Sequence, residues 1–320
     1  MTKPIILLGG GHLRLGKFSG GVKHLNLWTK IIRENGYEAY LVTQNGTFKS
    51  WLIEHQPVVS YAKAEKWRDQ NRNLKSVPMW LPVIEYYLKL TKQIYFYDCE
   101  IAKTCRPQHF TILQNLLSTK KIRGIATNSR YNQLWYRTTI NYSAMMINEW
   151  SDAEYWNPKP EIREKNLVGY TKEPRSDVVI QTISEICRKQ GFNFRFIKIQ
   201  GLKEIEILNL LRKCDYFLGT NPGKDPVHGE GCPRVGNEAM HAGCVVISFD
   251  VNGNQEYLEN EKTGFLIPRG NVNTMAKKLI YLANHPEAKE RIRENSISFA
   301  LEKFSVPGRW EKIRDFLELE

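Results

Sequence analysis

The sequence lacks any hydrophobic run that could span a bilayer. None of its 320 residues falls in a stretch approaching the roughly 20 apolar residues that a membrane-spanning helix needs. Near the start, the aliphatic run of residues 5–8 ends at Gly9, so it is too short for the core of a secretory signal. These absences predict a cytoplasmic protein that is at most peripheral, at the inner face of the membrane.

Paired cysteines are absent as well. Pairs of the C-x-x-C type are typical of zinc sites, and disulfide frameworks are typical of short secreted chains. The pattern here argues against both and predicts reduced thiols that are mostly buried. The six cysteines stand apart, at Cys99, Cys105, Cys187, Cys214, Cys232 and Cys244.

Acidic residues are scarce in the first half of the chain. Residues 1–150 hold 21 Lys and Arg against 9 Asp and Glu, whereas residues 151–320 hold 25 of each. The net charge of +12 therefore comes from the first half, which also contains six of the eight Trp residues. Such a surface attracts phosphorylated lipid, acidic glycan or nucleic acid, and cations beside aromatic rings suit a membrane interface or a sugar platform. A charge excess spread evenly for solubility is the alternative.

Residues 61–92 combine these features in one place. A run of cations is followed by an apolar and aromatic stretch that contains Pro78 and Pro82. Because proline interrupts regular elements, we expect a broken segment laid on the surface. This segment is the predicted contact with an anionic membrane or an acidic acceptor.

The order of hydrophobic patterns predicts two α/β units in tandem. Residues 5–8 predict a buried strand, residues 22–32 follow with helical spacing, and residues 37–43 return to strand character. Further strands are expected at 94–97 and 124–127. The same alternation restarts in the second half, with strands at 167–170, 192–199, 216–218 and 245–248 and helices at 177–190, 204–212, 237–242 and 272–320.

Domain boundaries follow from composition. Residues 148–165 contain Asn157, Pro158 and Pro160 in a polar context that is typical of a linker. We expect an N-terminal domain at 1–150, a linker at 151–165, a C-terminal domain at 166–304 and a final helix at 305–320 that packs back toward the N-terminal domain.

A dinucleotide-binding pattern is also missing. The second strand ends at Thr43-Gln44, where an acidic residue would hold a ribose, and this disfavours nicotinamide cofactors. Gly20 and Gly21 nevertheless begin the first helix, where backbone NH groups can approach a phosphate; tight packing is the alternative. The glycines after the first strand form no G-x-G-x-x-G, because they stand at positions 9, 10, 11, 16, 20 and 21.

Two carboxylates stand in HGEGCPRVGNEAMHAGCVVIS, residues 228–248. Glu230 is predicted on a loop and Glu238 in the first turn of a helix, so the two can reach different parts of one extended ligand. Desolvated carboxylates accept strong hydrogen bonds from hydroxyl groups, which suits a polyol. The NH groups of Gly231 and Cys232 can assist. The alternative is a helix-end charge for Glu238 and a solvated Glu230.

The same stretch resembles the signature of retaining glycosyltransferase family 4. The family pattern EGxPxxxxEAMAxGxPVI corresponds to EGCPRVGNEAMHAGCVVI in this chain. Neighbouring motifs follow in the family's order: KCDYFLG and NQEYLENEKTGFLIP flank the signature, and FSGGVKH, NSRYNQ and VGYTKEPR precede it. The resemblance therefore spans nearly the whole chain.

This resemblance implies the α/β architecture called GT-B, two Rossmann-like doubly wound domains facing across a cleft. The N-terminal domain would hold a glycan or lipid-linked acceptor, and the C-terminal domain a UDP-, GDP- or ADP-type nucleotide sugar. Glu230 would contact the donor sugar, Glu238 the ribose, and Arg175 the diphosphate. The implied donor-binding residues are Gly20, Gly21, Lys172, Arg175, Glu230, Gly231, Cys232, Pro233, Arg234 and Glu238.

The chain departs from the family pattern at two places. Tyr170 stands where an Arg is usual, so one diphosphate cation is missing, with Lys172 or Arg234 as its substitute. The family's His in the N-terminal domain has no clear counterpart. The residues near its place are Asp98, which we take as catalytic together with Glu230 and Arg175, and Glu100, whereas His109 is expected to be a solvated loop residue.

Charge development determines the expected mechanism. Cleavage of a sugar from a diphosphate needs cations at the leaving group and carboxylates near the ring. No metal-binding D-x-D pattern stands near the expected donor residues, so we predict transfer without a metal ion or other cofactor. Retention of configuration is implied by the resemblance. The expected role is in polysaccharide or lipopolysaccharide biosynthesis, without a nucleic-acid partner.

Three alternatives remain. A nucleotide-sugar epimerase can share the two-domain architecture, and it would form product without an acceptor. A non-enzymatic nucleic-acid-binding protein would use the basic first half and bind with steep salt dependence, but it leaves the two glutamates without a purpose. An inactive transferase is suggested by Tyr170.

Overall fold

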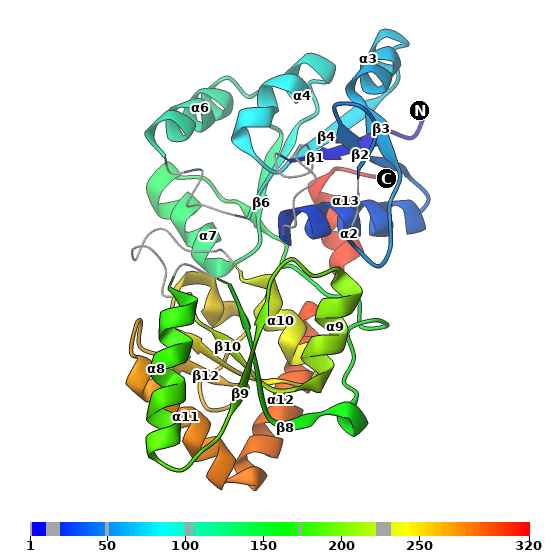
Figure 1. The fold of residues 1–320 in the computed structure, drawn as a ribbon. Helices are drawn as coiled ribbons and strands as arrows, with labels where there is room; N and C mark the ends of the chain where they lie inside the picture. Colours follow the sequence, from blue (N-terminus) through cyan, green and yellow to red (C-terminus); the bar gives the residue numbers. More distant parts are fainter. Residues whose placement is uncertain are drawn as a thin grey trace. The chain divides into compact units, whose positions relative to one another are not determined.

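The computed structural model describes residues 2–10, 20–48, 51–99, 104, 106–172, 175–221 and 232–320. Over these residues the chain forms two compact units, unit 1 (Met1–Asn148 with Pro307–Glu320) and unit 2 (Glu149–Val306). Each unit carries parallel strands with helices packed on them (Figure 1). None of the helices in the described ranges is both long enough and apolar enough to cross a membrane.

Unit 1 contains a four-stranded parallel sheet in the order β3-β2-β1-β4 and a three-stranded one in the order β5-β6-β7. A parallel bridge between Ser76 and Ile94 joins the two, so they continue each other. The chain reverses its winding direction between β1 and β4, the kind of position where open α/β sheets bind ligands. The strands are β1 (Ile5–Gly9), β2 (Glu38–Thr43), β3 (Val58–Ser60), β4 (Leu74–Pro78), β5 (Tyr95–Asp98), β6 (Gly124–Thr127) and β7 (Met145–Met146).

Helix α2 (Gly20–Glu34) packs on this sheet because its apolar residues recur at helical spacing. It is followed by Gly36, whose φ of +79° is a left-handed conformation that favours glycine. The C-terminal helix α13 (Arg309–Phe316) is part of unit 1, and its Phe316 ring packs edge-on against Trp28 of α2. The other helices described in this unit are α3 (Tyr61–Asp69), η1 (Leu81–Val83), α4 (Ile84–Leu90), α6 (Pro107–Ser118), α7 (Arg130–Trp135) and the π-helix η2 (Tyr136–Ile140).

The expectation of a broken surface segment at residues 61–92 is wrong for its second part, whereas helix α3 (Tyr61–Asp69) does lie on the surface, with Ala64 as its buried residue. Strand β4 lies in this range, pairs with β1 and is buried along its whole length. Pro78 is the last residue of that strand and Pro82 lies in the first turn of η1, positions at which proline costs little. Much of the apolar stretch is therefore core, whereas Trp80 is exposed. The buried side chains of the stretch include Leu81, Ile84, Tyr87 and Leu90.

Unit 2 has a five-stranded parallel sheet in the order β12-β11-β10-β8-β9. Numbered within the unit this is the order 2-1-3-4-5, a doubly wound arrangement whose winding reverses between β8 and β10. The central strands β10 and β11 are buried almost along their whole length and are largely apolar, whereas the edge strand β9 is partly exposed. The strands are β8 (Glu164–Thr171), β9 (Arg195–Ile199), β10 (Cys214–Gly219), β11 (Val245–Phe249) and β12 (Phe265–Ile267).

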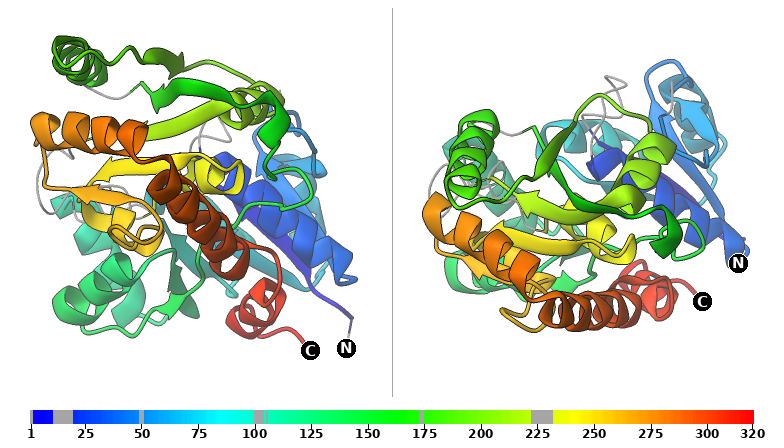
Figure 2. Two further views of the ribbon diagram at one scale, coloured as in Figure 1. Left: turned by 90° about the horizontal axis from the view of Figure 1, so that it is seen from below. Right: turned by 60° about the horizontal axis from the view of Figure 1, so that its bottom comes forward.

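The helices of unit 2 form two layers. Helix α8 packs against α11 on one face, and α10 packs against α9 and α12 on the other. Figure 2 shows α8 and α11 as neighbours from two further directions. The helices are η3 (Pro160–Ile162), α8 (Ser176–Lys189), α9 (Glu204–Lys213), α10 (Arg234–His241), η4 (Asn252–Glu256), α11 (Val272–Asn284) and α12 (Pro286–Phe304).

Residues 149–163, here called the strap, lead into this unit and are packed against it. Trp150 and Trp156 of the strap are each 1% exposed. Arg212 of α9 donates hydrogen bonds to the carbonyl oxygens of Tyr155 and Asn157 at 2.7 and 3.0 Å. The strap is therefore polar in composition, but two buried tryptophan side chains hold it on unit 2.

Candidate functional site

The site is built at the winding reversal of unit 2. Helix α8 is the next helix after β8, and α10 is the next described helix after β10 (Figure 1). The two helices belong to different layers of the unit. Right-handed crossovers in opposite directions place these two helices on opposite faces. A crevice forms between the carboxyl ends of such strands, and ligands of doubly wound proteins bind there.

Arg175 marks the start of α8. It is exposed and holds a left-handed conformation with φ of +70°, which is uncommon for a residue with a side chain. Its carbonyl oxygen accepts the first helical hydrogen bond, from the Val179 amide at 3.1 Å. Lys172, directly after the preceding strand β8, is also exposed. Both cations are therefore accessible at the carboxyl edge of the sheet.

Tyr170, the residue that stands in place of an expected arginine, is a buried member of β8. Its hydroxyl donates to Asp177 of α8 at 3.3 Å, and burial, more than the neighbouring carboxylate, raises the pKa of this phenol. Asp177 also pairs with Lys198 at 2.7 Å. Position 170 therefore supports the start of α8 and supplies no positive charge.

Helix α10 carries the second predicted carboxylate. Cys232 and Glu238 are 5% and 4% exposed, and Pro233 directly precedes the first helical residue, Arg234. The predicted first turn at Asn237 is thus the second turn, because the helix starts three residues earlier than its apolar pattern suggests. Glu230 and Gly231 lie outside the described residues.

Arg234 connects Glu238 to the strap. Its Nε lies 3.7 Å from Glu238 Oε1, and its Nη1 lies 3.6 Å from Glu149 Oε2. Both guanidinium NH2 groups donate to the Trp150 carbonyl oxygen, at 2.8 and 2.9 Å. All three charged side chains are less than a tenth exposed. The carboxylate of Glu238 is thus part of a buried network of charged groups.

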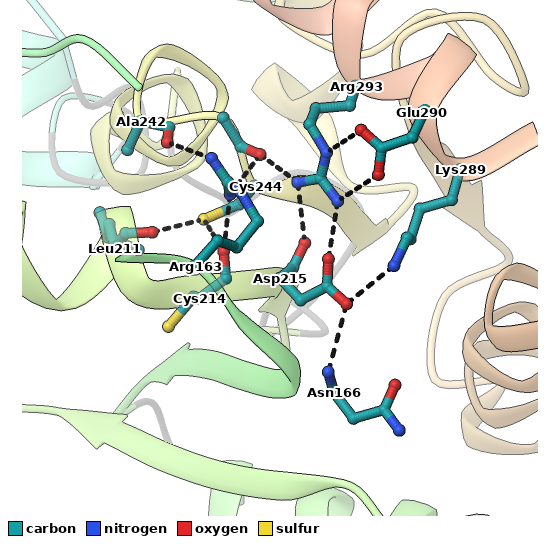
Figure 3. A network of polar contacts seen from close by, with 11 residues as sticks. Arg163, Asn166, Leu211, Cys214, Asp215, Ala242, Cys244, Lys289, Glu290 and Arg293 are labelled. Carbon is teal, nitrogen blue, oxygen red and sulfur yellow. Dashed lines mark hydrogen bonds and ion pairs between the residues drawn. The ribbon is translucent and has the colours of Figure 1, made fainter. Parts of the chain in front are cut away.

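The opposite end of α10 is held by two further arginines (Figure 3). Arg163 of the strap donates to the carbonyl oxygens of Ala242 and Gly243 at 3.2 and 2.7 Å, and also to that of Cys214. Arg293 of α12 donates to the same Gly243 carbonyl oxygen. Cations at the last carbonyls of a helix satisfy acceptors that have no partner within the helix.

Asp215 of β10 balances this positive charge. It accepts from Arg293 Nη2 at 2.6 Å and from Lys289 Nζ at 2.9 Å, and the Asn166 amide donates to it at 3.2 Å (Figure 3). Burial alone would raise the pKa of Asp215, but the two cations and the amide lower it below the ordinary value. Asp215 is therefore ionised, and both of its carboxylate oxygens accept hydrogen bonds from other groups of the protein.

The predicted site residues of unit 1 also lie at a carboxyl edge. Gly20 and Gly21 are the first residues of α2, and Asp98 is the last residue of β5. Asp98 is 2% exposed and accepts a hydrogen bond from the Tyr136 hydroxyl at 2.8 Å. Burial and the Asp98 charge together raise the pKa of Tyr136, which keeps this hydroxyl a donor. Glu100 lies outside the described residues.

The prediction for His109 is wrong. It lies on α6, not on a loop, and is only 7% exposed. Pro107 occupies the first turn of this helix, where its missing amide donor is not needed. His109 therefore packs within unit 1.

In unit 2, the start of α10 brings together Cys232, Pro233, Arg234 and Glu238. Lys172 and Arg175 lie at the start of α8. Sequence reasoning missed Glu149, which pairs with Arg234 from inside a segment that looked like a linker. The neighbouring Trp150 was the available signal, because a large aromatic residue in a polar segment indicates an anchored one. In the described ranges, no three His, Cys, Asp or Glu side chains are grouped so that they could hold a metal ion.

In a comparison with known protein families, the part of the chain that contains α10 gives a match. Residues 181–299 match the family described as "Glycosyl transferases group 1". Over 177 residues the chain is 27% identical to the capsular polysaccharide biosynthesis glycosyltransferase CapM of Staphylococcus aureus. This match covers 48% of the chain and 46% of CapM, so the chain spans about half the length of that relative.

Solved structures are similar over the whole chain. A glycosyltransferase from Rickettsia africae has a TM-score of 0.72 at 14% identity, with all of both chains covered. The Anabaena protein HepE, solved in complex with UDP, has a TM-score of 0.69 at 15% identity and covers 98% of this chain and 99% of its own. The chain therefore has the α/β GT-B fold that these glycosyltransferases share.

Proposed function

We propose that this chain, whose residues 181–299 match the group 1 glycosyltransferases, is a retaining glycosyltransferase that moves a sugar from a nucleotide sugar to a glycan or lipid-linked acceptor. The relative CapM is named for capsular polysaccharide biosynthesis, and HepE was solved with UDP. These names favour a uridine nucleotide among the UDP, GDP and ADP types and a polysaccharide among the acceptors.

The observation that carries the proposal is the position of Glu238. It is a buried carboxylate on the helix that follows β10, beside the winding reversal of unit 2, within the segment that matches the family. A desolvated carboxylate accepts hydrogen bonds from a diol more strongly than an exposed one, because water does not compete. Glu238 would bind the two ribose hydroxyls in this way.

Cations at the other helix start would serve the leaving group. Negative charge grows on the diphosphate as the glycosidic bond breaks, so groups that stabilise it lower the barrier. Arg175 and Lys172 are exposed at the start of α8, and a helix N-terminus adds its own attraction for anions. The amides of Gly20 and Gly21, at the N-terminus of α2, would bind the same diphosphate.

Catalysis would rest on Glu230, Arg175 and Asp98, with no metal ion or other cofactor. Glu230 would face the sugar ring, where a carboxylate stabilises the positive charge of an oxocarbenium-like transition state. Asp98 is the buried carboxylate of unit 1 and would act on the acceptor side. Retention of configuration would follow from attack on the same face as the leaving phosphate.

A nucleotide screen followed by a transfer assay tests this proposal. Thermal unfolding is recorded with UDP-, GDP-, ADP- and dTDP-sugars, because a ligand that binds only the folded state raises the unfolding temperature. We expect one class of nucleotide sugar to raise it, and the R175A variant to lose most of that effect. Transfer to a polysaccharide acceptor with retained anomeric configuration, unchanged by EDTA, is the expected activity. Product formed without any acceptor would instead indicate an epimerase.

A peripheral membrane location is the remaining part of the proposal. The net charge of residues 1–150 would attract the chain to an anionic bilayer at the cytoplasmic side. We expect sedimentation with vesicles that contain phosphatidylglycerol, lost in about 0.5 M salt because screening shortens the range of the attraction. Absence of binding at low salt would contradict this location and leave the transferase assignment intact.

A further inference from the structure

Arg234 is fixed by the protein itself. Its side chain is 5% exposed, and both NH2 groups of its guanidinium donate to one backbone oxygen, that of Trp150. Bidentate contacts of this kind set the orientation of the planar group. A guanidinium held in this way does not reach out toward a diphosphate, so the cation missing at position 170 is not replaced by Arg234.

The same guanidinium lies between two carboxylates. Glu149 and Glu238 are 3.6 and 3.7 Å from it, within ion-pair distance but beyond the length of a hydrogen bond. At the low effective dielectric of a buried position, an attraction of this kind still fixes where a carboxylate sits. Arg234 therefore acts on Glu238 through its charge rather than through a hydrogen bond.

The first residues of the strap directly follow the point where the chain passes from unit 1 to unit 2. Glu149 is the first residue of unit 2, directly after Asn148 of unit 1. The amide of Ser151 donates to the carbonyl oxygen of Phe304 at 2.8 Å, and Phe304 stands just before the chain returns to unit 1 at Pro307. Both chain connections between the units are therefore tied together beside the residues that Arg234 contacts.

We propose that Arg234 is a positioning residue that holds the Glu238 carboxylate for the ribose of the nucleotide and links it, through Glu149 and Trp150, to the strap. This proposal rests on the proposed function, since it assigns Glu238 to the ribose. It gives Arg234 a different role from the diphosphate contact that its position in the signature suggests. Loss of Arg234 changes how well the protein recognises ribose hydroxyls, beyond any change in its stability.

Calorimetric titration with matched nucleotides tests the proposal. UDP, GDP and ADP are each compared with the 2′,3′-dideoxy form, which lacks the ribose hydroxyls. In the wild type, we expect removal of the hydroxyls to weaken binding about tenfold or more, as for hydrogen bonds to a charged group. In R234M, this ratio falls toward one, because Glu238 is no longer held. In E149Q it falls part of the way, because Arg234 loses one carboxylate partner but keeps its contacts with Trp150 and Glu238. R234K keeps the charge but not the bidentate contact, so its ratio lies between those of the wild type and R234M.

The control is R212M. Arg212 also donates to strap carbonyls but does not contact Glu238 or Arg234, so its loss disturbs the strap while leaving the ratio as in the wild type. Circular dichroism and thermal unfolding identify variants that fail to fold, and E149Q and R234K then carry the test. Equal weakening of both nucleotide forms in R234M and E149Q, with the wild-type ratio kept, overturns the proposal and leaves a purely structural arginine.

Failure of the proposed function gives a different result. If the wild type binds none of the three nucleotides, the transferase assignment and this proposal both fail. If it binds a nucleotide but does not distinguish the dideoxy form, the positioning role is overturned, whereas the transfer assay still decides the activity.

Discussion

The two ends of α10 are held by arginines in different ways. At its start, Arg234 stands 3.6 and 3.7 Å from two carboxylates and donates its hydrogen bonds to a backbone oxygen. At its end, Arg293 meets Asp215 at 2.6 Å, and Lys289 meets the same carboxylate at 2.9 Å. At the start of the helix the arginine and the carboxylates are at ion-pair distance, whereas at its end the cations and the carboxylate are at hydrogen-bond distance. We infer that the start of α10 serves binding and its end serves stability.

Substitution of Asp215 gives the largest expected effect. D215N leaves Arg293 and Lys289 beside a neutral group, and loss of one partner of a buried ion pair costs about 3–5 kcal/mol. Chemical denaturation of the wild type and the variant measures the difference in unfolding free energy. The control is D177N, whose exposed carboxylate pairs with Lys198 and whose loss changes stability far less. Equal effects of the two substitutions would contradict the contrast between the helix ends.

The pH dependence of stability sharpens the same contrast. Because the cations lower the pKa of Asp215 in the folded state, its contribution is complete above the unfolded value of about 3.9. It is lost as the pH falls through the lower folded value. The stability difference between the wild type and D215N is therefore expected to stay constant from about pH 5 to pH 8 and to shrink below about pH 4. A difference that shrinks already at neutral pH would show that another group titrates.

Gly243 allows a smaller and more local test. A Cβ atom there would lie 2.6 Å from Arg163 Nη2 and 3.1 Å from Pro158 Cβ, and the residue has φ of +84°. G243A therefore combines backbone strain of about 1–2 kcal/mol with a displaced arginine. Gly191 is a matched control, with φ of +83° and nothing within 4 Å of an added Cβ atom. We expect G243A to destabilise more than G191A in thermal unfolding, and equal losses would mean that Arg163 moves aside without cost.

Cysteine reactivity gives the smallest expected effect. Cys244, which follows the end of α10 and directly precedes β11, is fully buried, and burial raises the pKa of its thiol to about 12. Cys99 of unit 1 is partly exposed. Alkylation by iodoacetamide at about pH 8 requires an accessible thiolate, so peptide mapping should find Cys99 modified long before Cys244. Similar rates would show that the end of α10 opens readily.

The sequence was a good guide to long and periodic elements. Strand β1 and helix α2 lie close to their predicted ranges, because an apolar run before glycines and a helical repeat each leave a clear pattern. Short elements were missed: β7 has two residues and β12 has three, which is too few to show a period. The buried strand β4 was missed because Pro78 at its end resembles a break.

The residues of the candidate site were likewise predicted only in part. The signature located Glu238 on a helix but left Arg234 outside it, because the predicted helix began at Asn237. In the structure α10 begins at Arg234 and places the two residues, four apart, on the same side. It did not identify the partner Glu149, nor the role of Arg163, since both come from a segment whose composition resembles a linker. Predictions for Glu230 and Gly231 remain predictions, because these residues lie outside the described part of the chain.

Local chemistry in the sequence determined the alternation of strands and helices, the surplus of positive charge in the first half and the position of Glu238 on a helix. Only the tertiary structure decided which charges meet. Burial removes the competing water, so an arginine and a carboxylate far apart in the sequence interact strongly once packing brings them within ion-pair distance, and no pattern along the chain records that meeting.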